Sequence, residues 1–82
     1  MPRVRLFSHL AQVLGARELA VEGATLGEAL AALQDRFGDA LRQRLAGCTV
    51  MINERQVDPQ RDADAPLGPE DELGLLPPAA GG

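Results

Sequence analysis

The chain has 82 residues, a formal net charge of −4, 45% hydrophobic residues and only two aromatic ones, Phe7 and Phe37. A chain of this length forms one domain with a thin core, so a binding or carrier module is a better interpretation than a free-standing enzyme with a sizeable substrate cavity. The acidic charge and the scarcity of aromatic residues argue against nucleic-acid binding, and they lead us to expect a partner with a basic surface.

Cysteine content and hydropathy bear on localisation. The single cysteine, Cys48, cannot form an internal disulfide, which is typical of a reducing compartment. No apolar leader segment follows residues 1–5, which include two arginines, and no apolar run reaches membrane length. We therefore expect a cytoplasmic protein with no membrane partner.

Two strands are expected near the start of the chain. Residues 3–7 alternate as a strand does, which places Val4 and Leu6 on one face and Phe7 on the other. Residues 17–22 alternate again and should pair with the first strand.

Two helices are expected in the first half of the chain. Ser8 is expected to cap a short helix over residues 9–14. Thr25 and Glu28 have the spacing of a capping box. The apolar stripe behind them predicts a longer amphipathic helix to about Phe37, with its apolar face formed by Leu26, Ala29, Leu30, Leu33 and Phe37.

The second half is expected to return to strands. Asp39 should cap a short helix over residues 39–45, and residues 48–53 should form the third strand. A short returning strand is expected at 56–57, and the last strand at 72–76.

The side chains that most often carry chemistry lack partners in this sequence. His9 and Cys48 are single, and the spaced carboxylates Asp58, Asp62 and Asp64 lack the glycine and terminal glutamate of a calcium loop. We therefore expect no metal site. The irregular segment 58–70 is interpreted as a solvated acidic loop.

The end of the chain carries the clearest functional pattern. Pro77 and Pro78 lack amide hydrogens and stop sheet pairing, so residues 1–76 should form the domain and 77–82 a flexible tail. Gly81 and Gly82 carry no side chains, so the terminal carboxylate can pass through a narrow slot into a partner's active site. There it can attack the α-phosphate of ATP and become an acyl-adenylate.

All eight basic residues are arginines, and the chain contains no lysine. A genomic bias toward arginine codons is the favoured explanation of this composition. Its consequence is that the activated end finds no side-chain amine on its own chain, and only the Met1 α-amine remains as an acceptor.

The order of these elements predicts an α+β fold of the β-grasp, or ubiquitin-like, type: a mixed sheet of four to five strands with one main helix packed across one face. The first and last strands would be parallel neighbours. Phe7 and Leu76 would then lie side by side on the face away from the helix, and Met51 could join them. Such a patch indicates a docking surface beside the tail, unless a loop or a second copy covers it.

Several motifs together resemble those of the MoaD/ThiS family of ubiquitin-like sulfur carriers. The similarity covers essentially the whole chain and rests on the segments 5–7, 50–53, 66–67, 71–73 and 76–82. Within that family the motifs are most similar to the molybdopterin branch, in which the carrier is the small subunit of molybdopterin synthase.

The resemblance implies a defined chemistry. An E1-like adenylyltransferase of the MoeB/ThiF type, which uses ATP and magnesium, would adenylate Gly82, and a persulfide would convert it to a thiocarboxylate. The sulfur would pass to the molybdopterin precursor inside a MoaE-type large subunit, in a heterotetramer, and the catalytic side chains would belong to that subunit. The carrier itself would bind no cofactor. It would contribute Gly82 as the sulfur donor and Gly81 as the clearance residue, whose missing side chain lets the tail pass through a narrow slot. The docking surface would be formed by Phe7, Leu76, Pro77 and Pro78.

Other acceptors remain open. Carriers for thiamine thiazole, tRNA thiolation or cysteine synthesis share the tail chemistry, and so does a ubiquitin-like protein modifier. A plain interaction module without tail chemistry is a further alternative. The chain also departs from the family pattern at Glu70, where a glycine is usual, and at Arg55 and Gln56, where an apolar residue is common. Pro69 indicates a type I turn that needs no glycine there.

Overall fold

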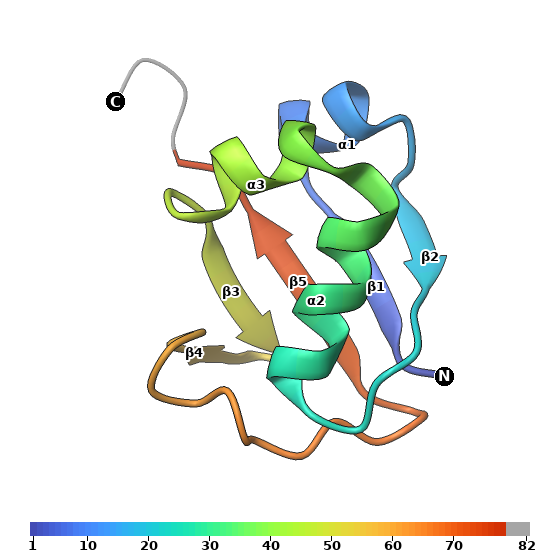
Figure 1. The fold of residues 1–82 in the computed structure, drawn as a ribbon, viewed down its shortest axis with the longest axis vertical. Coiled ribbons are helices and arrows are strands. Elements are labelled where there is room, and N and C mark those ends of the chain that lie inside the picture. Colours follow the sequence, from blue (N-terminus) through green and yellow to red (C-terminus); the bar gives the residue numbers. More distant parts are fainter. Residues whose placement is uncertain (79–82) are drawn as a thin grey trace.

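The computed structural model describes residues 1–78, and residues 79–82 lie outside the described part of the chain. Its elements follow in the order β1 (Arg3–Leu6), α1 (Ser8–Leu14), β2 (Glu18–Ala20), α2 (Leu26–Phe37), α3 (Asp39–Leu45), β3 (Thr49–Ile52), β4 (Arg55–Val57) and β5 (Glu72–Leu76). The strands form one mixed sheet in the order β2-β1-β5-β3-β4, and α2 crosses one face of it (Figure 1). This is the predicted β-grasp fold.

The parallel pairing of β1 with β5 organises the sheet. Arg3 is opposite Glu72 and Leu6 is opposite Leu75, so the first and last strands run in the same direction. β3 lies antiparallel on the other side of β5, and β2 and β4 form the two edges. As a consequence, the start of the chain and the end of β5 lie at opposite ends of the sheet (Figure 1).

Helix α2 begins with the predicted capping box. The Glu28 amide donates to Thr25 Oγ1 at 3.2 Å, and Glu28 Oε1 accepts from the Ala24 amide at 2.8 Å. The Glu28 amide is one of those that the first helical turn leaves unpaired, and the Ala24 amide belongs to the residue before the N-cap Thr25. The helix ends at Phe37, before Gly38 in the left-handed region at φ 64°.

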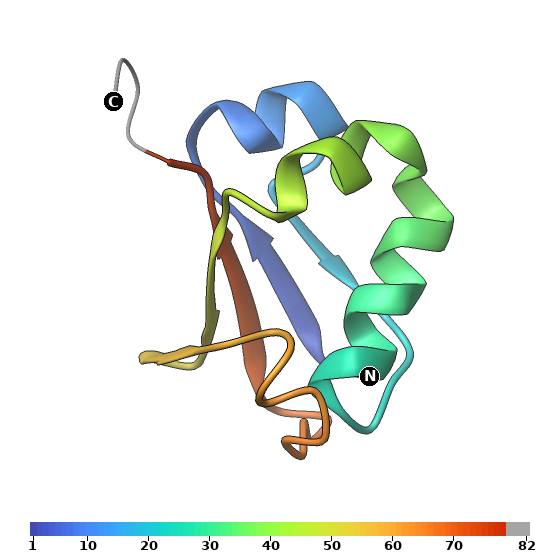
Figure 2. The same ribbon diagram turned by 60° about the vertical axis from the view of Figure 1, so that its left-hand side comes forward.

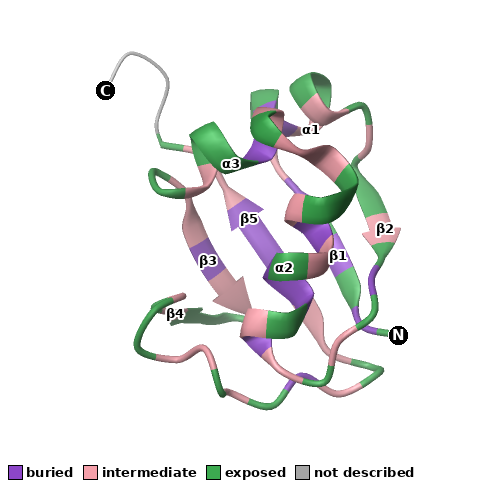
Figure 3. Ribbon diagram, viewed as in Figure 1, coloured by how far each residue is buried: buried purple, intermediate pink, exposed green. Residues whose placement is uncertain are grey.

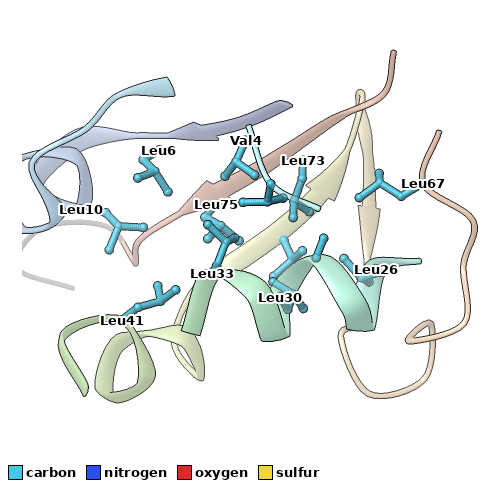
Figure 4. Packing of buried hydrophobic residues seen from close by; sticks show 13 residues of the cluster. Val4, Leu6, Leu10, Leu26, Leu30, Leu33, Leu41, Leu67, Leu73 and Leu75 are labelled. Carbon is cyan, nitrogen blue, oxygen red and sulfur yellow. The ribbon is translucent and has the colours of Figure 1, made fainter. Parts of the chain in front are cut away.

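The core fills the space between α2 and the sheet. In Figure 4 the α2 side chains Leu26, Leu30 and Leu33 point toward Leu73 and Leu75 of the central strand. The short helices and a loop close the core at its edges, through Leu10, Leu41 and Leu67. Figure 3 shows the resulting pattern, in which the central strands are largely buried and the outward turns of the helices are exposed. The buried hydrophobic set is Val4, Leu6, Leu10, Val21, Leu26, Ala29, Leu30, Leu33, Leu41, Val50, Leu67, Leu73 and Leu75.

Two predicted helix caps are wrong. Phe7, not Ser8, is the N-cap of α1, and no side chain caps that helix; Ser8 has a φ of 53°. The N-cap of α3 is Gly38, not Asp39. Asp39 instead accepts a hydrogen bond from Arg42 within the helix. Both errors arise because a polar residue was taken as a cap, while the backbone turn lies one residue earlier.

The predicted strand boundaries differ by one or two residues. Residues 17–22 shorten to β2, and the returning strand begins at Arg55 rather than at 56. The turn at Pro69 is confirmed, because the Asp71 amide donates to the Gly68 carbonyl at 3.1 Å and Glu70 needs no positive φ.

Candidate functional site

Four residues meet on the sheet face that the helices leave uncovered, seen edge-on in Figure 2. A Cβ atom placed on Gly74 would lie 3.5 Å from Phe7 Cε2, 3.8 Å from Leu76 Cδ1 and 3.9 Å from Met51 Cβ. The side chains of Phe7, Met51 and Leu76 therefore surround the bare backbone of Gly74. We call these four residues the outer-face patch.

The alternation of β5 explains the position of this patch. Leu73 and Leu75 are fully buried under α2, so Gly74 and Leu76 project from the opposite face. The Phe7 amide donates to the Leu75 carbonyl at 3.2 Å, which continues the pairing of β1 with β5 past Leu6. The side chain of Phe7 consequently lies on the same face as Leu76.

Gly74 is a member of the patch that the sequence analysis missed. Its neighbours in register are Arg5 on one side and Met51 on the other. A glycine inside an apolar strand is unfavourable unless something approaches its backbone closely. This rule is the signal in the sequence by which Gly74 could have been found. The group that approaches its backbone is the ring of Phe7.

Charged pairs border the patch on the β1 side. Arg3 Nη1 lies 3.3 Å from Glu18 Oε1, and Arg5 Nε lies 3.9 Å from Glu72 Oε2. All four side chains are more than a third exposed, so each pair adds little to stability. A partner that covers the apolar side chains of the patch can therefore replace these ion pairs with ion pairs to its own side chains, at a small cost in free energy.

The chain leaves the sheet directly beside the patch. Pro77 and Pro78 follow Leu76, and the Pro78 ring lies 3.8 Å from where a Cβ on Gly47 would sit. A small cavity of about 220 Å³, the tail-exit groove, opens there between α1 and the end of α3, and is lined by His9, Leu10, Gln43, Arg44, Gly47, Pro77 and Pro78. The docking residues proposed from the sequence, Phe7, Leu76, Pro77 and Pro78, are thus close together at one end of the sheet.

The predicted sulfur donor, Gly82, and the clearance residue, Gly81, lie outside the described residues. Their roles stay predictions. The same holds for the proposed boundary between a domain at 1–76 and a tail at 77–82.

Cys48 is packed as a structural residue. Its Sγ donates to the Arg44 carbonyl at 3.3 Å, and burial raises the pKa of the Cys48 thiol. A raised pKa leaves less thiolate at neutral pH and makes this sulfur a poor nucleophile.

The acidic loop uses its carboxylates internally. Asp58 Oδ1 accepts from the amides of Gln60 and Arg61, and Asp62 Oδ2 accepts from the Asp58 amide. Arg61 also pairs with Asp62 at 2.9 Å and holds the pKa of that carboxyl at about 2. Within residues 1–78, no three His, Cys, Asp or Glu side chains are grouped as metal ligands. None of the helices in the described part of the chain is long and apolar enough to span a membrane.

Comparisons with known proteins identify the family. The model of the ThiS family matches residues 4–82, which is nearly the entire chain and includes the terminal diglycine. The chain belongs to the ThiS family. It is thus a ubiquitin-like protein of the sulfur-carrier or small-modifier type.

Solved structures of several ThiS-like proteins resemble this one over almost their full length. Small archaeal modifier protein 1 (SAMP1) from Haloferax volcanii is 31% identical, with a TM-score of 0.81 over 98% of this chain and 97% of that one. SAMP1 from Methanosarcina acetivorans is 26% identical, with a TM-score of 0.82 over 98% and 94%. A chain in the complex of subunits 1 and 2 of the Helicobacter pylori molybdopterin-converting factor is 28% identical, with a TM-score of 0.71 over 98% and 96%. A search of curated proteins finds no match.

Proposed function

We propose that this ThiS family protein is a sulfur carrier and acyl donor that acts through the carboxylate of Gly82. The observation that carries the proposal is the family match, which extends through the diglycine to the last residue. The geometry agrees with it, because the outer-face patch and the tail-exit groove lie where the chain leaves the sheet.

The chemistry proceeds in three displacements. A carboxylate oxygen of Gly82 attacks the α-phosphate of ATP in an E1-like enzyme of the ThiF/MoeB type, pyrophosphate leaves, and an acyl-adenylate forms. A persulfide sulfur then attacks the carbonyl carbon and AMP leaves. A second thiol of the sulfur donor cleaves the resulting acyl disulfide, which releases the thiocarboxylate and leaves a disulfide on the donor.

The body of the protein supplies the positioning. Phe7, Met51 and Leu76 give an apolar surface that a partner covers, and Pro77 follows Leu76 without an intervening hinge residue. The two prolines have fixed φ and keep the first part of the tail extended. Docking of the patch therefore determines where the tail enters the partner.

The remaining question is which molecule receives the sulfur or the acyl group of Gly82. The motifs alone favour the molybdopterin branch, but the 31% identity to a small archaeal modifier protein gives more support to transfer onto target proteins. We therefore place protein modification first. Sulfur delivery as the small subunit of molybdopterin synthase, with a MoaE-type large subunit, is the second candidate, supported by the 28% identity to a chain of the H. pylori complex.

The test of the common step is intact-mass spectrometry. The chain is incubated with a ThiF/MoeB-type enzyme, ATP, magnesium and a sulfide source. We expect a mass gain of one oxygen-to-sulfur exchange that fragmentation assigns to Gly82. A chain lacking Gly82 is the control. If the full chain stays unchanged, or if the truncated chain gains the sulfur, the proposal is wrong.

The acceptors are separated by a second measurement in cells that express the chain. The last arginine is Arg61, so trypsin leaves residues 62–82 as a branch on every modified lysine. Branched peptides of this kind support the modifier. Their absence, together with recovery of a MoaE-type subunit bound to the chain, supports the molybdopterin role.

A further inference from the structure

Charged residues are distributed unevenly along the chain. Residues 1–52 contain six arginines and five carboxylates, whereas residues 53–72 contain two arginines and seven carboxylates. The acidic segment begins after β3 and ends at the start of β5, where the Asn53 amide donates to the Glu72 carbonyl. Most of it therefore lies at the end of the sheet opposite to Pro78 (Figure 1).

Arginines gather at the other end. Arg36 lies in the last turn of α2, and Arg42 and Arg44 lie in the last turn of α3. The carbonyl of Arg17 accepts from the Leu6 amide at the end of β1, which places Arg17 at the same end. Arg44 lines the tail-exit groove itself.

The guanidinium of Arg44 has most of its hydrogen-bonding capacity free. Its Nη1 donates to the Ala40 carbonyl at 2.8 Å, and the side chain is exposed. Arg42 in the same turn is already paired with Asp39 at 2.6 Å. No ion pair within residues 1–78 includes Arg44. A guanidinium with free donors is suited to bind a carboxylate in two-point contact.

We propose that Arg44 contacts carboxylates on the partner surface that surrounds the entrance for the tail. This inference rests on the proposed function, because a partner that receives the tail must bring its surface against the tail-exit groove. Positive charge at this end attracts an acidic rim and repels a basic one. The net charge of −4 comes mainly from the acidic segment, most of which lies at the end of the sheet opposite to Pro78. The composition alone predicted a partner with a basic surface. At the end where the tail leaves, the arginines predict an acidic partner surface instead.

The test is a charge series at Arg44 in the thiocarboxylate reaction with a ThiF/MoeB-type enzyme. We expect kcat/KM to fall about threefold for Arg44→Gln and about tenfold for Arg44→Glu. Arg44→Lys keeps the charge but loses the two-point geometry, so its loss should lie between those of the unsubstituted chain and Arg44→Gln. The differences should shrink at high salt, because screening weakens exposed charge pairs. The matched control is Arg61→Glu, which changes the net charge equally within the acidic loop and should stay within about twofold of the unsubstituted chain.

Each outcome decides the proposal. Equal rates for Arg44→Glu and the unsubstituted chain, or equal losses for Arg44→Glu and Arg61→Glu, would overturn it and leave the proposed function intact. No conversion of the unsubstituted chain would overturn both. Thermal melting of each variant separates a docking effect from unfolding, and Arg44→Gln keeps the series informative if the glutamate variant unfolds.

Discussion

Phe7 Cε2 lies 3.5 Å from the point that a Cβ atom on Gly74 would occupy. The ring of Phe7 therefore rests on the one position of β5 that presents no side chain to the outer face. Leu76 Cδ1 and Met51 Cβ lie 3.8 and 3.9 Å from the same point, so all three side chains converge on Gly74. The patch thus depends on a glycine as much as on its apolar side chains.

The size of residue 74 should determine the position of the Phe7 ring. Gly74→Ala adds a Cβ at ordinary van der Waals distances, so we expect partner binding within about twofold and a stability gain of up to about 1 kcal/mol from reduced freedom in the unfolded chain. Gly74→Val adds two further methyl groups that must displace the ring, and we expect it to weaken binding by about tenfold or more. Chemical denaturation and titration calorimetry with the ThiF/MoeB-type enzyme measure the two effects. Equal binding of both variants would show that the ring position does not matter.

Phe7 and Leu76 should act as binding anchors. Phe7→Ala or Leu76→Asp is expected to weaken partner binding by about 2 kcal/mol or more, because truncation removes an anchor at the centre of the contact. Both side chains are only partly buried, so the melting temperature should change little. Titration calorimetry and thermal melting on the same samples give the two numbers.

Leu75 provides the contrasting control. It neighbours Leu76 but is fully buried beneath α2. Leu75→Ala should lower the free energy of unfolding by about 2 to 5 kcal/mol through the cavity it creates. A similar loss for Leu76→Asp would place Leu76 in the core and contradict its docking role.

The fold followed from the sequence because the dominant patterns were regular. The alternation of residues 3–7 and 72–76 predicted two strands whose inner faces match, and the stripe after Thr25 predicted the helix that covers them. The placement of Phe7 and Leu76 on the opposite face follows from the same alternation. Local patterns of this kind are strong when one face of each element must be buried.

Features set by tertiary contacts were not predictable. Leu67 stands in an irregular, acidic stretch with no periodicity, yet it is buried, because the Leu67 amide donates to the Ala24 carbonyl and ties the loop to the start of α2. Gly74 was assigned no role from the sequence, since its role depends on Phe7, which is distant in sequence. The arginine-rich end was hidden because net charge carries no information on where charges lie.

The turn before β5 should make stability depend on pH. The Gly68 amide donates to Asp71 Oδ2 at 2.8 Å and Asn53 Nδ2 donates to Asp71 Oδ1 at 3.2 Å, and these bonds lower the pKa of Asp71 from 3.8. A carboxyl whose pKa is lower in the folded chain than in the unfolded chain stabilises the fold at pH values above its unfolded pKa. That contribution is lost as the pH falls through the folded pKa. Asp71→Asn should therefore lower the melting temperature near neutral pH and have a smaller effect at about pH 3.

Asp64→Asn is the control for this effect, because Asp64 accepts no hydrogen bond from the described residues that is comparable to those of Asp71. Its melting temperature should follow that of the unsubstituted chain from neutral to acidic pH. If Asp71→Asn also follows the unsubstituted chain throughout, the network around Asp71 does not contribute to the pH dependence.

The absence of lysine should prevent a second copy from attaching to a side-chain amine of the first. A target modified through Gly82 receives no side-chain amine to which a second copy could attach. The Met1 α-amine remains, but within one chain it lies beyond the start of β1, at the far end of the sheet from Pro78. The five residues of β5 already span about 16 Å, whereas the four residues after Pro78 reach at most about 14 Å. The activated end therefore cannot close on its own Met1.

Intact-mass analysis of a purified conjugate measures the number of copies on each modified lysine, and the trypsin branch 62–82 locates them. We expect no second copy linked through a side chain of the first, and no cyclised chain. Arg61→Lys is the matched variant, because it places a single exposed amine on the same body and should allow a second copy to attach at residue 61. If the lysine-free chain forms longer chains through a residue other than Met1, the acceptor is not an amine, and the acyl-transfer step would have to be assigned to a side-chain hydroxyl or thiol.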